Sequence, residues 1–180
     1  MAKFYDTLSH DLQEFIEAQK IFFTGTAATD GRINVSPKGM DALRVLSPDK
    51  LIWLNLTGSG NETAAHIRQV NRITLMWCAF DGKPLILRVY GKATAIHPKD
   101  AKWDEYLSQF NETAGARQVF EVHIESVQTS CGFAVPLMEY KEDRPILKDW
   151  AEKKGEAGVK EYWEQKNVTS IDGLETGIFE

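Results

Sequence analysis

The residues best suited to ligand chemistry lie in the segment 55–67, NLTGSGNETAAHI, which follows an apolar run and opens a helical pattern. A helix N-terminus exposes up to about four unpaired backbone N–H groups and the positive end of the helix dipole, so it stabilises a bound oxyanion. Ser59, Asn61 and Thr63 would add side-chain donors there. The segment is therefore one candidate for a phosphate site.

Helix capping is a second interpretation of the same segment. Ser59 would be the N-cap, and Glu62, three positions later, would fold back on it as in a capping box. Glu62 also competes with any bound anion for the helix dipole. Two known phosphate motifs do not match: the G-x-G-x-x-G fingerprint needs a parallel βαβ unit, and a Walker A loop needs Gly-Lys-Ser/Thr. Capping and phosphate binding both remain open on this segment alone.

A polar row in the segment INVSPKG (33–39) favours the phosphate interpretation. Asn34, Ser36 and Lys38 alternate with apolar residues, so they would share one face of a strand. Taken alone, such a row is typical of a solvated face. Beside the 57–60 turn, however, Lys38 would supply the positive charge that the turn lacks. The two segments together outline a site for a phosphate monoester.

The elements that must position these residues are mainly strands. Asp30-Gly31 between two β-rich runs predicts a hairpin, and Asp81-Gly82 marks a second turn. Apolar spacing predicts a first helix through Leu8, Leu12, Phe15 and Ile16 and a second between Pro98 and Phe110. Strands are expected at 21–28, 33–39, 51–56, 73–80, 85–96 and 118–128. Hairpin connections favour a closed or partly closed antiparallel barrel, because closure removes unpaired edges.

Length and composition predict one main domain with an appendage. The 180 residues, 43% of them hydrophobic, suffice for one substantial core. We expect a barrel domain over 1–135 and an extension over 136–180 that is rich in Lys and Glu and carries short helices near 146–154 and 159–166. This extension is expected to pack on the barrel or to reach a partner subunit.

Charge and hydropathy argue against several classes of function. A net charge of −5 provides no basic field for nucleic acid. No apolar run approaches the roughly 18 residues of a membrane span, and the N-terminus lacks a secretory apolar region, so we expect a soluble, cytoplasmic protein with no membrane partner. Two distant cysteines and four scattered histidines predict no metal site and no catalytic triad.

The order and spacing of INVSPKG, LIWLNLTGSGNETAAHI, NRITLMW and LILRVYGKA resemble the pyridoxamine 5'-phosphate oxidase-like flavoproteins over roughly Phe22 to Ile124. The resemblance implies a mainly β (α+β) fold, a six-stranded antiparallel split β-barrel with short flanking helices and a helical C-terminal tail. It also implies a homodimer with FMN at the interface. The cofactor-binding residues that it implies are Asn34, Val35, Ser36 and Lys38, then Leu54, Asn55 and Thr57, then Ser59, Asn61 and Thr63, and finally Arg88.

Two departures from the biosynthetic oxidases of that family limit the functional prediction. Those enzymes carry Ser-Arg-Lys where this chain has Asn61-Glu62-Thr63, and they end in an Arg-x-His motif that GLETGIFE lacks. Oxidation of pyridoxamine phosphate is therefore not expected. We predict an FMN-dependent oxidoreductase for an unidentified small molecule, in which the flavin ring, not a side chain, carries the reaction. The alternative is a non-catalytic module that holds flavin, haem or another cofactor for sensing or storage, and a deazaflavin is a variant of the first prediction.

Overall fold

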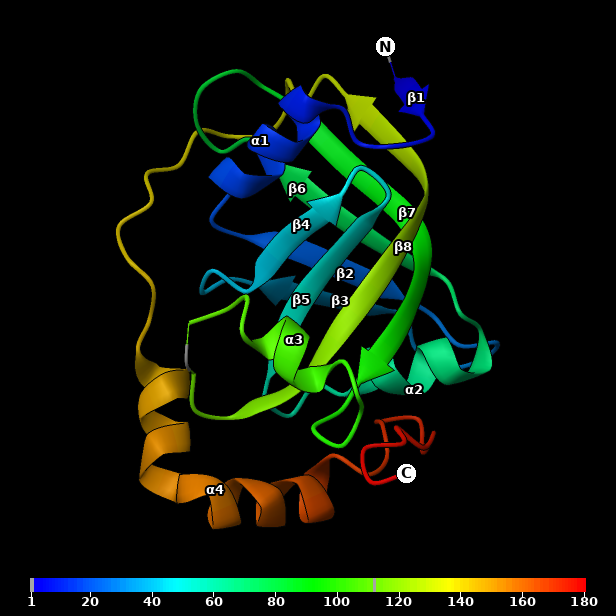
Figure 1. Ribbon diagram of the computed structural model, residues 1–180. Helices are drawn as coiled ribbons and strands as arrows, with labels where there is room; N and C mark the ends of the chain where they lie inside the picture. The colour runs from blue at the N-terminus through cyan, green and yellow to red at the C-terminus, as the bar shows by residue number, and fades with distance from the viewer. Residues whose placement is uncertain (1, 112) are drawn as a thin grey trace.

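The computed structural model describes residues 2–111 and 113–180, which form an open, strongly curved sheet with helices around it (Figure 1). The strands of this described part are β1 (Lys3–Tyr5), β2 (Phe22–Thr26), β3 (Asn34–Lys38), β4 (Leu43–Ser47), β5 (Lys50–Leu56), β6 (Ile73–Cys78), β7 (Ile86–Ile96) and β8 (Ala116–Ser130). Its helices are α1 (His10–Ala18), α2 (Glu62–Gln69), α3 (Trp103–Leu107) and α4 (Ile146–Lys166).

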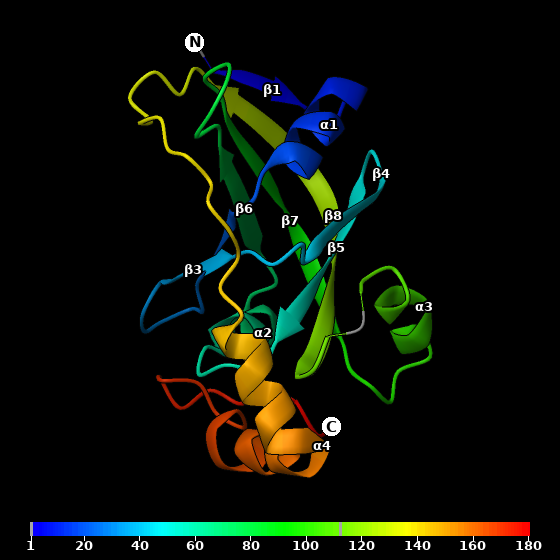
Figure 2. The same ribbon diagram turned by 90° about the vertical axis from the view of Figure 1, so that its left-hand side faces the viewer.

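The sheet has the strand order β3-β2-β6-β7-β8-β5-β4, with β1 added to β8, and every pairing is antiparallel. Its two end strands, β3 and β4, are not paired with each other, so the sheet curls without closing (Figures 1 and 2). The predicted split β-barrel is confirmed, and all six predicted strands are present. The prediction omitted β1 and β4, because neither short segment has a buried alternating face.

The long pair β7 and β8 contains a bulge. Their register shifts between Tyr90 and Gly91. A Cβ atom at Gly91 would overlap the backbone oxygen of His123. Glycine at this position therefore allows the two backbones to approach closely at the bulge.

Two apolar clusters lie on opposite faces of the sheet. The main cluster includes Leu12 and Ile16 of α1, and Trp53 stacks on Phe120 there with 4.4 Å between ring centroids. The second cluster joins α3 to the outer face of β5 and β8. Because β5 is buried on both faces, the run LIWLNL is apolar at nearly every position.

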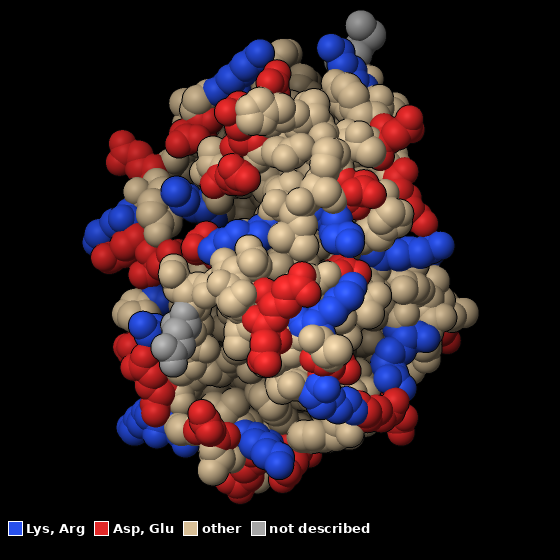
Figure 3. Space-filling view, in the orientation of Figure 1, with Lys and Arg blue, Asp and Glu red and all other residues tan. Residues whose placement is uncertain are grey.

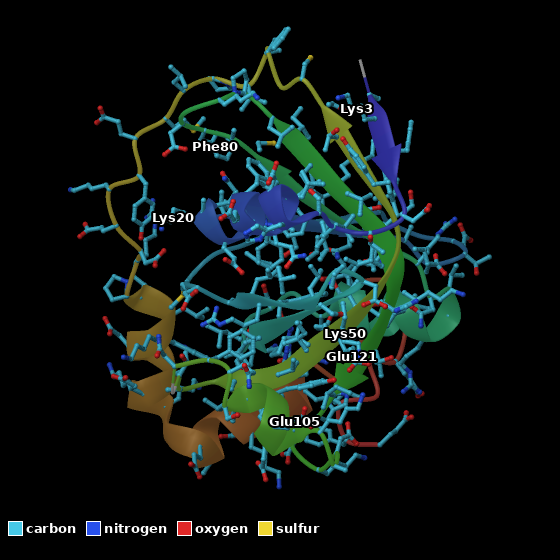
Figure 4. All side chains as sticks on the ribbon, turned by 45° about the horizontal axis from the view of Figure 1, so that its top comes forward. Lys3, Lys20, Lys50, Phe80, Glu105 and Glu121 are labelled. Atoms are coloured by element: carbon cyan, nitrogen blue, oxygen red, sulfur yellow. The ribbon has the colours of Figure 1, made fainter. Side chains whose placement is uncertain are left out.

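The predicted helices are confirmed, and side-chain hydrogen bonds cap α1 and join α3 to β8. Ser9 caps α1 by accepting the Leu12 N–H (3.4 Å). Lys102, the N-cap of α3, donates to Glu121 of β8 at 2.9 Å, and Tyr106 also donates to this carboxylate, which Figure 4 labels. The two helices expected in the extension are the two halves of α4, which meet at a kink where Gly155 has a φ of 67°.

The segment 131–145, here called the strap, runs along the outside of the barrel from β8 to α4 (Figures 1 and 2). The chain after α4 folds back beneath the barrel near α2 and ends there (Figure 1). Asp172 of this tail pairs with Arg32, and Glu180 pairs with Arg68 at 2.7 Å. Within the described chain, no helix is both long and apolar enough to cross a bilayer.

Candidate anion and cofactor site

The segments that the sequence linked, β3 and the start of α2, lie in direct contact. Asn34 Nδ2 donates to Thr63 Oγ1 at 3.1 Å and to Thr26 Oγ1 at 3.0 Å. Lys38 Nζ donates to Ser36 Oγ at 2.6 Å on the same face of β3. A small polar cavity, here called the anion pocket, is lined by Asn34, Ser36, Lys38, Asn55, Gly60, Asn61, Glu62, Thr63, Ala64, Arg117, Gln118 and Phe120.

The helix start that borders the anion pocket is not closed by the predicted capping box. Asn61, not Ser59, is the N-cap of α2, and its side chain makes no capping hydrogen bond. Instead, the Glu62 carboxylate accepts the Asn61 backbone N–H at 3.0 Å. The Asn61 side chain points to the C-terminal tail, where it donates to the carbonyls of Thr169 (2.8 Å) and Lys166 (3.4 Å). The capping interpretation with Ser59 was therefore wrong.

Arg117, which the sequence analysis did not select, is the most buried charge of the anion pocket. Its side chain is almost inaccessible to solvent, and it donates to the carbonyls of Gly58 (3.1 Å) and Gly60 (2.5 Å). These bonds hold the 57–61 turn against β8. Burial lowers the pKa of Arg117 to about 10, with Glu62 acting in the opposite direction. In the sequence, Arg117 is distinguished only as one basic residue directly before the alternating part of a strand.

Lys38 brings a second cation to the anion pocket. Burial, followed by the charge of Arg117, lowers its pKa to about 8, while the Glu62 carboxylate raises it. A lowered lysine pKa means that the charged form is poorly stabilised at this position. Lys38 and Arg117 face one carboxylate, that of Glu62, so the anion pocket has an excess positive charge at neutral pH.

Gln118 supplies a buried donor without a partner. Only 2% of the residue is exposed, and its Oε1 accepts from Arg117 Nε (3.0 Å) and Asn55 Nδ2 (3.2 Å). These two contacts identify the oxygen of the side-chain amide, so the remaining amide atom is the nitrogen, Nε2. Nε2 has no hydrogen-bond partner among the described residues. An unpaired buried donor costs about 1–3 kcal/mol. A ligand oxygen in the anion pocket would remove that cost.

The structure brings together six of the eleven predicted site residues. These six line the anion pocket: Asn34, Ser36, Lys38, Asn55, Asn61 and Thr63. Strand alternation on β3 and the short loop before α2 make this convergence possible, because they turn both polar rows toward the same space.

The other five predicted residues do not line the anion pocket. Val35 is 69% exposed, because alternation on β3 turns it to the outer face, and Leu54 packs in the second core cluster. Thr57 is buried, where its hydroxyl donates to the Gly115 carbonyl and accepts from Trp163 Nε1. The remaining two are Ser59, which is exposed beside the C-terminal tail, and Arg88, whose side chain lies opposite to the buried Leu87 and Val89.

A much larger apolar cavity of about 1070 Å³ lies beneath the strap. Ring and methyl groups dominate its walls, among them Phe23, Met40, Phe80, Met138, Trp150 and Tyr162. Phe80 and Lys20, which both line it, lie on the side of the barrel that the strap passes (Figure 4). The end of β3 borders both spaces, since Lys38 lines the anion pocket and Gly39 lines the apolar cavity. The 57–61 turn also borders both, since Gly60 lines the anion pocket and Gly58 lines the apolar cavity.

The surface in Figure 3 has positive and negative side chains intermingled, and no broad basic area covers the described residues on that face. The described residues also contain no group of three or more His, Cys, Asp or Glu side chains that would hold a metal ion. The anion pocket and the apolar cavity are thus the principal candidate binding features.

The fold defines a split β-barrel protein. A family model described as pyridoxamine 5'-phosphate oxidase matches residues 8–131, and the chain belongs to this family. The pyridoxamine 5'-phosphate oxidase family protein ustO of Aspergillus flavus is 38% identical over 194 aligned positions, which cover 97% of this chain and 77% of that protein.

Solved structures share the fold at lower identity. A putative pyridoxamine 5'-phosphate oxidase from Lactobacillus delbrueckii superposes with a TM-score of 0.54 at 22% identity, over 68% of this chain and 94% of that one. An FAD binding protein from Mycobacterium smegmatis gives a TM-score of 0.50 at 15% identity, over 69% and 96% of the two chains. At these identities the similarity establishes the fold alone.

Proposed function

We propose that this protein binds FMN, with the phosphate in the anion pocket, and acts as a flavin-dependent oxidoreductase on a small molecule. The observation that carries the proposal is the unpaired, buried Nε2 of Gln118 in a pocket that also contains Lys38 and Arg117. These groups are the donors and charges that a phosphate monoester requires. The adjoining apolar cavity offers the aromatic surface that a flavin ring requires.

In this proposal the chain binds and orients the cofactor. Lys38, Gln118 and the free backbone N–H groups of the first α2 turn would hold the phosphate, and Arg117 would keep the 57–61 turn in place. The aromatic side chains of the apolar cavity would exclude water from the ring and from a substrate beside it. When bound, a flavin supplies hydride or electron transfer, so no side-chain nucleophile is needed.

We further propose a homodimer. β3 is an edge strand; Val35 on its outer face is 69% exposed, and Ile33, which directly precedes the strand, is 77% exposed. Large apolar side chains of the strap, including Phe133 and Leu137, are also exposed. Exposed large apolar side chains suit contact with another protein surface, and a second copy is the partner that the family resemblance implies. Sedimentation of the purified protein would test this association.

The decisive experiment for cofactor binding is an absorbance spectrum of the purified protein with mass spectrometry of any released molecule, followed by titration with FMN, FAD and riboflavin. We expect FMN to bind at least tenfold more tightly than riboflavin, which lacks the phosphate. Equal affinity for the two would contradict a phosphate role for the anion pocket. No flavin in the protein and no uptake of added FMN would contradict the proposed function.

A non-catalytic cofactor-binding module is the second candidate. The observation that favours it is the Glu62 carboxylate in the lining of the anion pocket, because its charge weakens the binding of a phosphate-bearing cofactor there. Stopped-flow mixing of the flavin-loaded protein with NADH or NADPH, followed by an electron acceptor, separates the candidates. Rapid flavin reduction and repeated turnover would exclude storage or sensing without catalysis, and stable bound flavin without reduction would favour it.

A further inference from the structure

The anion pocket is nearly filled by its own side chains. Its free volume is about 10 Å³, which is about the space of one water molecule and too little for a phosphate group. The lining includes two cations and an unpaired donor, yet a ligand of the matching charge has no room unless a lining side chain moves. A lining side chain therefore has to leave the space that a bound anion would take.

Glu62 is the side chain whose chemistry matches that position. It is the one carboxylate among the described residues that line the anion pocket. Its Oε2 accepts the Asn61 N–H at the start of α2, where the helix dipole favours an anion, and it would lie 3.5 Å from a Cβ atom at Gly60. Glu62 is also the charge that favours the protonated forms of both Lys38 and Arg117.

Among the described residues, Glu62 makes one side-chain hydrogen bond, accepted from the Asn61 backbone N–H at 3.0 Å. It forms no ion pair within 4.0 Å with a described Lys or Arg, and the side chain is only partly buried. By contrast, Arg117 is held by three hydrogen bonds and Asn34 by two. Rotation of the Glu62 side chain toward solvent would free the helix start and remove the negative charge nearest to the pocket.

We propose that the Glu62 carboxylate occupies the helix-start end of the anion pocket, where it accepts the Asn61 N–H, and competes there with the phosphate of the ligand. Glu62 is then a specificity-determining residue: it lowers the affinity for phosphate-bearing ligands and has to be displaced when one binds. This inference rests on the proposed function for the identity of the full ligand. The competition itself concerns any phosphate group, free or esterified.

The test compares the wild type with Glu62→Gln, because glutamine keeps the size of the side chain and an oxygen for the Asn61 N–H but removes the charge. Inorganic phosphate, FMN and riboflavin are titrated against both proteins by calorimetry. Glu105→Gln is the matched control, since Glu105 is an exposed first-turn glutamate of α3 (labelled in Figure 4) that does not line the anion pocket.

We expect Glu62→Gln to bind inorganic phosphate and FMN at least about tenfold more tightly than the wild type, because removal of a neighbouring like charge is commonly equivalent to one pKa unit or more. Riboflavin affinity and the Glu105→Gln protein should be unchanged. Unchanged or weaker phosphate and FMN binding by Glu62→Gln would overturn the inference. If Glu62→Gln strengthens phosphate binding while neither protein binds FMN, the inference stands and the proposed function fails. Absence of binding for all three ligands would overturn both.

Discussion

Replacing Lys38 with methionine should stabilise the ligand-free protein while it weakens anion binding. Burial is the main cause that lowers the pKa of Lys38 from 10.5 to about 8. At neutral pH the charged side chain therefore costs the folded state up to about 3 kcal/mol relative to an ordinary lysine. Methionine fills a similar volume without the charge, but it loses the 2.6 Å bond to Ser36 Oγ, worth about 1 kcal/mol. We expect a net gain of about 2 kcal/mol at pH 7.

The stability that Lys38→Met gains over the wild type should decrease as the pH rises. Below about pH 8, Lys38 is protonated in both the folded and the unfolded state, so the full cost is present. Between about pH 8 and 10.5 the folded state releases the proton first, and the wild type becomes more stable relative to Lys38→Met as the pH rises. Above pH 10.5 both states are neutral and the difference due to charge disappears.

Urea unfolding followed by tryptophan fluorescence at pH 7, 8.5 and 10.5 measures this difference, with Lys92→Met as the matched control. Lys92 lies on β7, and 61% of its side chain is exposed, so its replacement should change the free energy of unfolding by less than about 0.5 kcal/mol. FMN affinity at pH 7 should fall at least tenfold in Lys38→Met. The reasoning is refuted if Lys38→Met destabilises the protein at pH 7, or if its stability relative to the wild type is the same at all three pH values.

Three further substitutions test the framework around the site. Arg117→Met should lower the free energy of unfolding by about 3 kcal/mol or more, because the Gly58 and Gly60 carbonyls both lose hydrogen bonds from a charged donor; a urea curve like that of the exposed-site control Arg72→Met would contradict this. Gly91→Ala should lower the melting temperature by at least about 10 °C through a clash with the β8 backbone, and an unchanged circular dichroism melt would show that the bulge tolerates a side chain. Trp163→Phe removes the 2.8 Å bond to Thr57 and should cost about 1 kcal/mol, with faster tryptic cleavage in the tail, whereas equal cleavage rates would mean that this contact does not hold α4.

Local patterns in the sequence were sufficient for most of the secondary structure. The Asp30-Gly31 turn, where Gly31 has a φ of 93°, predicted the β2–β3 hairpin, and apolar spacing predicted α1 and α3. These elements depend on interactions between residues close in the chain, so local sequence patterns are sufficient to predict them. β4 was missed because its stability depends on pairing with β5 and not on an apolar pattern of its own.

The β3 side of the anion pocket was likewise predictable, because strand alternation assigns Asn34, Ser36 and Lys38 to one face of the strand. The predictions for Val35 and Leu54 came from the family resemblance, and the anion pocket does not include them. Strand alternation turns Val35 away from Lys38, and a contact between Val35 and a flavin stays a prediction. No local pattern identified Arg117, which reaches the site only because β8 pairs with β5.

The sequence by itself determined the kinds of element, the polar face of β3 and the helix start at α2, since these depend on short-range geometry and side-chain type. Only the tertiary structure decided that Arg117 and Gln118 join them, that Asn61 turns to the C-terminal tail and that the Glu62 carboxylate accepts the Asn61 N–H beside the anion pocket. The physical reason is that the charge, hydration and free volume of a buried pocket arise from residues distant in the chain that strand pairing brings together. Those quantities do not exist until the sheet has formed.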